Sequence, residues 1–164
     1  MKRKLVISLP VFIVVAMALL LASCGPAPAP PTAKKTVRVE APPPREEWHR
    51  FPKAEMVETK LVETELMGKA FMPGGTLARY KRGGTEYEMF ICRLSSSDDA
   101  AVLLAEWRTV LTNPKLVYSF GGYFGEDSGR PVFVFPKGTW IAGVAGLPQK
   151  DAEQKASSLA AYLD

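Results

Sequence analysis

The residues that could support catalysis are few and are spread along the chain. The single histidine, His49, follows Glu46 and Glu47, and these three side chains could hold a metal ion weakly. Glu86 and Glu88 stand two residues apart, which would place both carboxylates on one face of a strand as a candidate acid and base pair. Zinc sites need three or four organised ligands, and exposed strand glutamates explain the second pattern without catalysis. We therefore expect no catalytic, cofactor-binding or metal-ligating residue, and we do not expect an enzyme.

Cys92 lies in the apolar stretch MFICRL, residues 89–94, and no CxxC motif accompanies it. A free cysteine in such a setting usually packs as a small hydrophobic side chain. The pattern predicts a buried and unreactive thiol. It also excludes a disulfide oxidoreductase.

The stretch GGYFGEDSG, residues 121–129, has the glycine content of a phosphate-binding loop but not its motif. No GK[ST] sequence follows it, and Glu126 and Asp127 would repel a phosphate. These two adjacent carboxylates also lack the spaced oxygen ligands of a calcium site. We interpret residues 125–129 as a polar turn between two aromatic strands.

The amino-terminal end has the pattern of an export signal. Three cations within the first four residues precede an uncharged apolar run over residues 5–21. This run is at the short limit for a bilayer-spanning helix, and Pro10 interrupts it, so a permanent transmembrane helix is the less favoured alternative. We predict a signal peptide over residues 1–23.

The last residues of this signal match a lipidation motif. Leu21, Ala22 and Ser23 place one branched apolar residue and two small ones before Cys24. This stretch resembles the lipobox of bacterial lipoproteins. The resemblance implies that the Cys24 thiol receives a diacylglyceryl group and that the signal is cut before Cys24. It also implies that the new amino terminus is acylated by a fatty acid such as palmitate.

The implied anchor is therefore the set of acyl chains on Cys24, which hold the protein at a lipid bilayer without a spanning helix. Two or three chains together make exchange from the bilayer negligible. Gly25, and not an aspartate, follows the cysteine. In bacteria with two membranes this resemblance implies sorting to the outer membrane, facing the periplasm.

Residues 24–45 are predicted to form a tether behind the lipidated cysteine. Seven prolines stand between Gly25 and Arg45, and the few apolar residues there follow neither a helical nor a strand period. Such a segment favours polyproline II structure, which extends by about 3.1 Å per residue. We predict a stiff spacer that does not fold, with a ligand for a proline-binding groove as the alternative.

The charge of the chain must be divided before it is interpreted. The whole sequence has 21 Lys and Arg against 17 Asp and Glu, but residues 46–164 carry 14 basic against 16 acidic side chains. The basic excess thus belongs to the signal and tether. The folded part gives no support to nucleic-acid binding, because that function needs a concentrated basic surface.

Residues 46–164 are long enough for one globular domain, which we assign to no family. Two segments, residues 75–94 and 130–146, have the pattern of hairpins, and each precedes a stretch with helical periodicity. Residues 132–135 are apolar at every position, which predicts central strands covered on both faces. We predict an α+β fold with an antiparallel sheet of five or six strands and two helices. The repeated order suggests a duplicated hairpin-plus-helix unit.

Two segments remain ambiguous at this level. Residues 55–71 could form a strand from about Met56 to Leu66 or could end as a helix before Pro73. Residues 116–125 are rich in aromatic side chains, as strands are, while Gly121 and Gly122 suggest a bend or a bulge.

Aromatic side chains are the one unusual concentration in the domain. Most of them must be core residues, but helices on only one face of the sheet would leave part of the set exposed on the other. Such a face would suit a peptide, a glycan or a lipid. The candidate residues are Tyr118, Phe120, Phe133, Phe135 and Trp140.

The combined pattern predicts a membrane-anchored lipoprotein with a non-catalytic extracytoplasmic domain. Its expected role is binding to an envelope protein, glycan or lipid, or support of an envelope assembly. The alternative is a membrane-tethered hydrolase or small-ligand carrier. A cleft that gathers His49, Glu86, Glu88 or Cys92 would favour the enzyme, and a shallow surface would favour the binding module.

Overall fold

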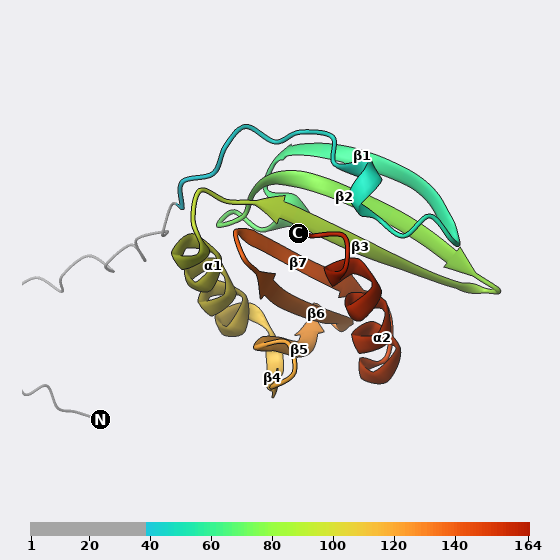
Figure 1. The fold of residues 1–164 in the computed structure, drawn as a ribbon. Coiled ribbons are helices and arrows are strands. Elements are labelled where there is room, and N and C mark those ends of the chain that lie inside the picture. Colours follow the sequence, from blue (N-terminus) through green and yellow to red (C-terminus); the bar gives the residue numbers. More distant parts are fainter. Residues whose placement is uncertain (1–38) are drawn as a thin grey trace, which may run out of the picture. The chain divides into compact units, whose positions relative to one another are not determined.

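The structure is a computed structural model, and it describes residues 39–164 (Figure 1). The predicted signal peptide, Cys24 and the predicted tether up to residue 38 lie outside the described residues. The described residues belong to one compact unit. Within them, neither helix has the length and apolar character that crossing a membrane would require.

A single sheet of seven antiparallel strands forms the centre of the fold, with the strand order β1-β2-β3-β7-β6-β5-β4. The α+β prediction is confirmed, but the sheet has seven strands and not five or six. The difference comes from the second ambiguous segment, residues 116–125, because it spans parts of two strands and not one. The strands are β1 (Met56–Thr64), β2 (Pro73–Arg82), β3 (Thr85–Arg93), β4 (Thr112–Val117), β5 (Gly122–Asp127), β6 (Arg130–Lys137) and β7 (Trp140–Ala145).

Both predicted hairpins are present. The β2–β3 hairpin turns at Gly83, which has a φ of 58°, and the β6–β7 hairpin turns at Gly138, which has a φ of 57°. Glycine adopts this left-handed conformation without steric cost, so the turn positions follow directly from the sequence. The ambiguous segment at residues 55–71 forms β1, followed by the short 3-10 helix η2 (Leu66–Gly68).

Two helices cover the sheet, α1 (Ser97–Val110) and α2 (Gln149–Ala160). Ser96 caps α1, because its side-chain oxygen accepts a hydrogen bond from the Asp99 backbone N–H at 3.1 Å. Asp98 and Asp99 add favourable negative charge in the first turn.

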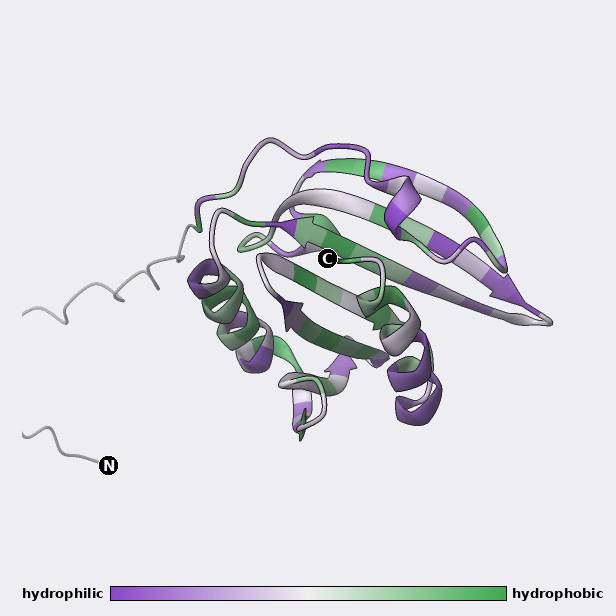
Figure 2. Cartoon of the chain, viewed as in Figure 1, coloured by the Kyte–Doolittle hydropathy of each residue, from purple (hydrophilic) through white to green (hydrophobic). Residues whose placement is uncertain are grey.

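The helices pack on opposite faces of the sheet (Figure 1). On one face, Leu103 and Trp107 of α1 share a core cluster with Val134 of β6. On the other face, Ala156 of α2 shares a cluster with Phe133 of β6. Figure 2 shows the resulting hydrophobic stretch along β6 and β7. The prediction that these strands are central and covered on both sides is confirmed.

The opposite placement of the helices bears on the suggested duplication. The order hairpin then helix does occur twice, as β2-β3-α1 and β6-β7-α2. However, a two-fold axis that exchanged the neighbouring antiparallel strands β3 and β7 would leave both helices on the same face. No such rotation relates the two units, and the duplication stays a hypothesis about the sequence.

The segment before the 3-10 helix η1 (Trp48–Arg50) lies against the domain, although it contains neither helix nor strand. We call residues 39–45 the strap. Val39 and Ala41 pack against the core cluster of α1, and the Ser95 backbone N–H donates to the Glu40 carbonyl at 3.4 Å. The expectation that the chain does not fold up to Arg45 is therefore wrong for residues 39–45.

Candidate functional site

Glu86 and Glu88 lie on the same strand, β3, as their spacing predicts, but each has its own cation. The Glu88 carboxylate contacts Arg130 Nη1 at 2.6 Å, and the Glu86 carboxylate contacts Lys81 Nζ at 3.1 Å. Each carboxylate is thus engaged by a different cation, from β6 for Glu88 and from β2 for Glu86. The two glutamates therefore form separate ion pairs and not an acid and base pair.

His49 lies in η1, where 57% of its side chain is exposed and its Nε2 is 3.4 Å from Glu47 Oε2. Within residues 39–164, no three His, Cys, Asp or Glu side chains come together in a group that could hold a metal ion. The Asp127 carboxylate is bound by Lys69 Nζ at 2.7 Å, so it is occupied by a cation of the protein itself.

Cys92 is fully buried in the core cluster of α1, as predicted. Burial raises the pKa of its thiol to about 12, because the interior disfavours the thiolate. This thiol does not share a cavity with His49 or with the two glutamates of β3.

The aromatic residues proposed as a ligand face do not form one exposed surface. Phe133, Phe135 and Trp140 are buried, and Phe120 packs edge to face on Phe133 at 5.2 Å between ring centroids. Only Tyr118, with 88% exposure, projects fully into solvent. The physical reason is that α2 covers the face on which the two β6 phenylalanines lie.

A cavity of about 360 Å³ lies between the strap, the start of β2, the end of β3 and the Trp140 ring. We call it the strap pocket. Its apolar lining comes from the three prolines of the strap, from two residues near the end of β3 and from the tryptophan at the start of β7. These lining residues are Pro42, Pro43, Pro44, Ile91, Leu94 and Trp140.

Thr76 attaches the end of the strap to the sheet. Its hydroxyl donates to the Arg45 carbonyl at 3.0 Å and accepts from the Glu47 backbone N–H at 3.2 Å. Thr76 is only 2% exposed and is the one buried polar residue among those described. Beside it, a Cβ at Gly75 would collide with the Ile91 carbonyl, so glycine permits the close approach of the strands in this wall.

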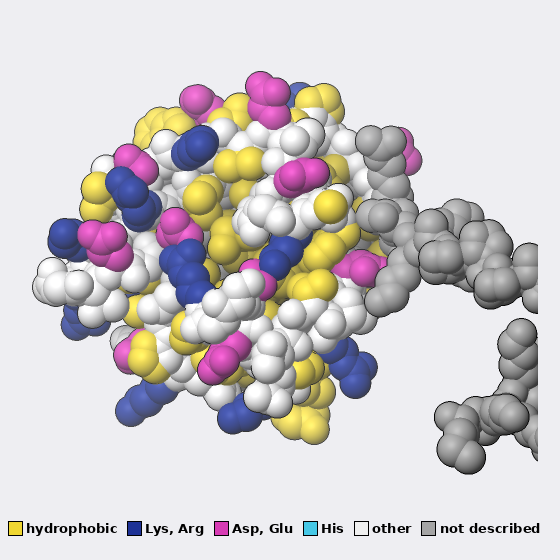
Figure 3. Space-filling view, turned by 180° about the vertical axis from the view of Figure 1, so that it is seen from behind, with side chains coloured by type: hydrophobic (Ala, Val, Ile, Leu, Met, Phe, Trp, Pro, Cys, Tyr) yellow, Lys and Arg dark blue, Asp and Glu magenta, His cyan; other side chains and the backbone are white. Residues whose placement is uncertain are grey.

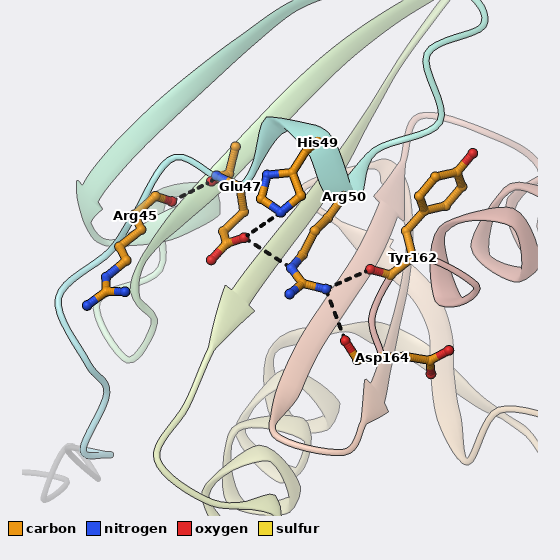
Figure 4. Close-up of polar contacts among 7 residues, drawn as sticks. Arg45, Glu47, His49, Arg50, Tyr162 and Asp164 are labelled. Carbon is orange, nitrogen blue, oxygen red and sulfur yellow. Dashed lines mark hydrogen bonds and ion pairs between the residues drawn. The ribbon is translucent and has the colours of Figure 1, made fainter.

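The basic side chains that line the strap pocket outnumber the acidic ones. The single carboxylate in the lining, that of Glu47, is held by Arg50 Nε at 3.0 Å and lies near His49 (Figure 4). Arg45 and Arg93 also line the pocket, and neither forms an ion pair with any of residues 39–164. The net charge at the pocket is therefore positive.

Arg50 holds this region together from the side opposite the strap. Its Nη1 donates to the Tyr162 carbonyl at 2.9 Å and to the Asp164 carbonyl at 3.2 Å (Figure 4). Its guanidinium lies 4.9 Å from the centroid of the Trp140 ring, and that of Arg93 lies 5.7 Å from the same ring. Trp140 is thereby fixed in place by cation–π contacts as well as by burial.

A second cavity, of about 480 Å³, lies between the β2–β3 turn and α2. Beside it the Glu55 carboxylate accepts hydrogen bonds from Lys155 Nζ at 2.8 Å and from the Tyr87 hydroxyl at 3.0 Å, and Arg82 lies 3.5 Å away. The hydrogen bond from Lys155, followed by that from Tyr87, lowers the pKa of Glu55. Since Glu55 partners all three groups, they form a structural cluster and leave no free cation for a ligand.

The strap pocket was missed at the level of the sequence, because the proline-rich stretch was expected not to fold as far as Arg45. The available signal was the pair Val39 and Ala41, two apolar residues in a stretch otherwise dominated by proline and charge. Trp140 was singled out in the sequence and does line this pocket, but as part of a different site from the one expected.

No family model matches the chain, and neither curated proteins nor solved structures give a match.

Proposed function

We propose that this chain is a bacterial lipoprotein whose folded part is a non-catalytic extracytoplasmic binding domain. In this proposal the acyl chains on Cys24 anchor the protein to the cell envelope, at the outer membrane facing the periplasm where the organism has two membranes. The folded part binds an envelope component or supports an assembly there.

The observation that carries the binding role is the contrast between two sets of residues. The groups that could act as acids, bases or nucleophiles are His49, Glu86, Glu88 and Cys92, and they are exposed, ion-paired or buried at separate places. By contrast, Arg45 and Arg93 line one cavity without ion-pair partners among the described residues. Unpaired positive charge in a preformed cavity that also has apolar walls favours binding.

The strap pocket also favours one of the two alternatives over the other. A small-ligand carrier needs a cavity in which apolar walls and a few polar groups converge, and the strap pocket, which is partly open to solvent, combines both. A hydrolase needs a nucleophile and a base within hydrogen-bond distance, and the four candidate residues do not converge. We therefore keep the carrier as the second candidate function.

The lipid anchor can be tested with the two cysteines of the chain as a matched pair. Cells that process bacterial lipoproteins would express the wild-type chain, Cys24→Ala and Cys92→Ala in the presence of an alkyne-bearing fatty acid. We expect label on the wild type and on Cys92→Ala, and a complete loss of label in Cys24→Ala. Label that persists without Cys24, or no label on the wild type, would contradict the anchor.

The binding role needs a separate experiment. The intact protein and a chain of residues 35–164 would be used for affinity capture from envelopes after cross-linking. Since the described residues belong to one compact unit with its own core, we expect the shorter chain to fold on its own. An envelope component captured by both chains would support the binding role, and one captured only by the intact protein would assign the interaction to residues 24–34 and the acyl chains and would contradict the binding role of the domain.

A further inference from the structure

We propose that the strap pocket binds a small organic oxyanion with a flat apolar body. In this arrangement Arg93 and Arg45 contact the acidic group, while Trp140 and the strap prolines contact the body. This inference rests on the proposed binding role of the domain. Ligand binding itself does not require the lipid anchor, whereas its effect on the reach of the tether does.

The size of the cavity limits the ligand to a small molecule. Its volume of about 360 Å³ is at the lower end of the range of about 300 to 1,000 Å³ for small-molecule sites. The strap lines it on one side, and the start of β2 and the end of β3 line it on another. Since neither strand is at an edge of the sheet, the pocket offers no free backbone for an added peptide strand.

The charges select an anion. Arg50 already compensates the Glu47 carboxylate, whereas Arg45 and Arg93 have no acidic partner among the described residues. A guanidinium presents two parallel N–H groups that match the oxygens of a carboxylate or a phosphate. Both arginines have exposed side chains, so an anion would gain these hydrogen bonds without separating an existing ion pair.

The remaining walls select an apolar and flat body. Pro42, Pro43 and Pro44 present rings and lack backbone N–H donors, so this wall offers no hydrogen-bond donor to water or ligand. Because their φ angles are fixed, the strap loses less conformational entropy when a ligand binds. Trp140 also lines the pocket; it is only 5% exposed and is held by two guanidinium groups, so it contributes a small but rigid part of the apolar wall.

The strap couples ligand binding to the tether. Because its prolines form one wall of the pocket, a bound ligand contacts the strap and the sheet at once and stabilises the docked strap. Release of residues 39–45 would add about 20 Å to the reach of the chain at about 3.1 Å per residue. Occupancy of the pocket would thus keep the domain closer to the point at which the chain is anchored.

Nuclear magnetic resonance of the 35–164 chain can test the proposal with probes that differ only in charge. The probes are 1-naphthaleneacetate and its neutral amide, 1-naphthaleneacetamide. The acid should shift the indole N–H signal of Trp140 and leave those of Trp48 and Trp107 unchanged, because only Trp140 lines the pocket. It should bind about tenfold more tightly than the amide, as expected for a charge-assisted hydrogen bond. A parallel titration with 1-naphthyl phosphate identifies which oxyanion the pocket prefers.

Arginine variants test which side chains contact the acidic group of the ligand. Arg93→Gln and Arg45→Gln should each reduce the affinity for the acid to about that for the amide. Arg108→Gln, on the α1 surface away from the pocket, should leave it unchanged. A thermal melt of each variant checks that the fold is intact. If Arg93→Gln does not fold, Arg45→Gln alone tests the role of the arginines.

Equal affinity for acid and amide, no shift at Trp140, or unchanged affinity in both arginine variants would overturn the pocket proposal. These results are distinct from a failure of the proposed function. An envelope component captured by the 35–164 chain together with a negative probe titration would contradict the ligand class alone.

Discussion

At the residue level, the burial of Cys92 determines how reactive its thiol is. Its thiol is fully buried and its pKa is raised to about 12 by burial, so almost no thiolate exists at neutral pH. We predict that N-ethylmaleimide at pH 8 leaves the native 35–164 chain unlabelled and labels it fully in urea. Since Cys92 is the only cysteine in that chain, intact mass gives the result directly. Rapid labelling of the native protein would restore the reactive interpretation.

Glu55 gives a second prediction at the residue level, because its charge is stabilised by neighbours. Hydrogen bonds from Lys155 and Tyr87 lower its pKa below the ordinary value of 4.5. Because of this lowered pKa, the folded protein keeps the Glu55 carboxylate charged at pH values at which the unfolded chain has begun to take up a proton. The stabilisation is therefore present above pH 4.5 and is lost as the pH falls through the lower folded-state value.

The variant Glu55→Gln tests this sign. We expect it to be less stable than the wild type at pH 7, and we expect the difference in free energy of unfolding to shrink as the pH falls below 4.5. Urea denaturation between pH 3 and pH 8 measures it. Glu63→Gln, an exposed residue on β1, is the control and should show no such trend. A difference that stays constant over this range would contradict the role given to Glu55.

At the level of elements, the strap depends on one side chain of β2. Thr76→Val keeps the shape of the residue but removes the hydrogen bonds to the Arg45 carbonyl and from the Glu47 N–H. We predict that this change speeds hydrogen exchange at the backbone of residues 39–47 and lowers stability by about 1 to 3 kcal/mol. Thr59→Val on the exposed edge strand β1 is the matched control. Unchanged exchange in the strap would show that Val39 and Ala41 suffice to hold it.

The elements that were predicted correctly are those with local signals. Gly83 and Gly138 mark both hairpin turns, and the serines and aspartates at residues 95–99 mark the start of α1. The alternation of β1 is weak because it is an edge strand with much of its surface exposed, so its sequence did not separate strand from helix.

The candidate site was harder to predict because it depends on contacts between distant segments. Arg45 and Trp140 lie 95 positions apart in the sequence and line the same pocket. Proline composition indicates polyproline II structure, but it does not say whether the segment docks on a domain. Likewise, the exposure of Phe133 and Phe135 depended on which face α2 covers, and no local pattern determines this.

For the whole molecule, the distribution of charge agrees with a role in binding a small ligand or one partner, and not a polyanion. Residues 46–164 carry 14 basic and 16 acidic side chains. On the face seen from behind in Figure 3, positive and negative side chains are interspersed around hydrophobic ones, without a large area of a single sign. The ion pairs of Arg79 with Glu58 and of Lys81 with Glu86 are about half exposed, so each contributes little to stability.

The account as a whole depends on an anchored domain, and the mass of the mature amino terminus tests that most directly. Protein purified from envelopes would be digested, and its first peptide would be sequenced by mass spectrometry. We predict a chain that begins at Cys24, with a diacylglyceryl group on the sulfur and a fatty acid on the amino group. An unmodified Cys24, or a peptide that still contains residues 1–23, would contradict the anchor.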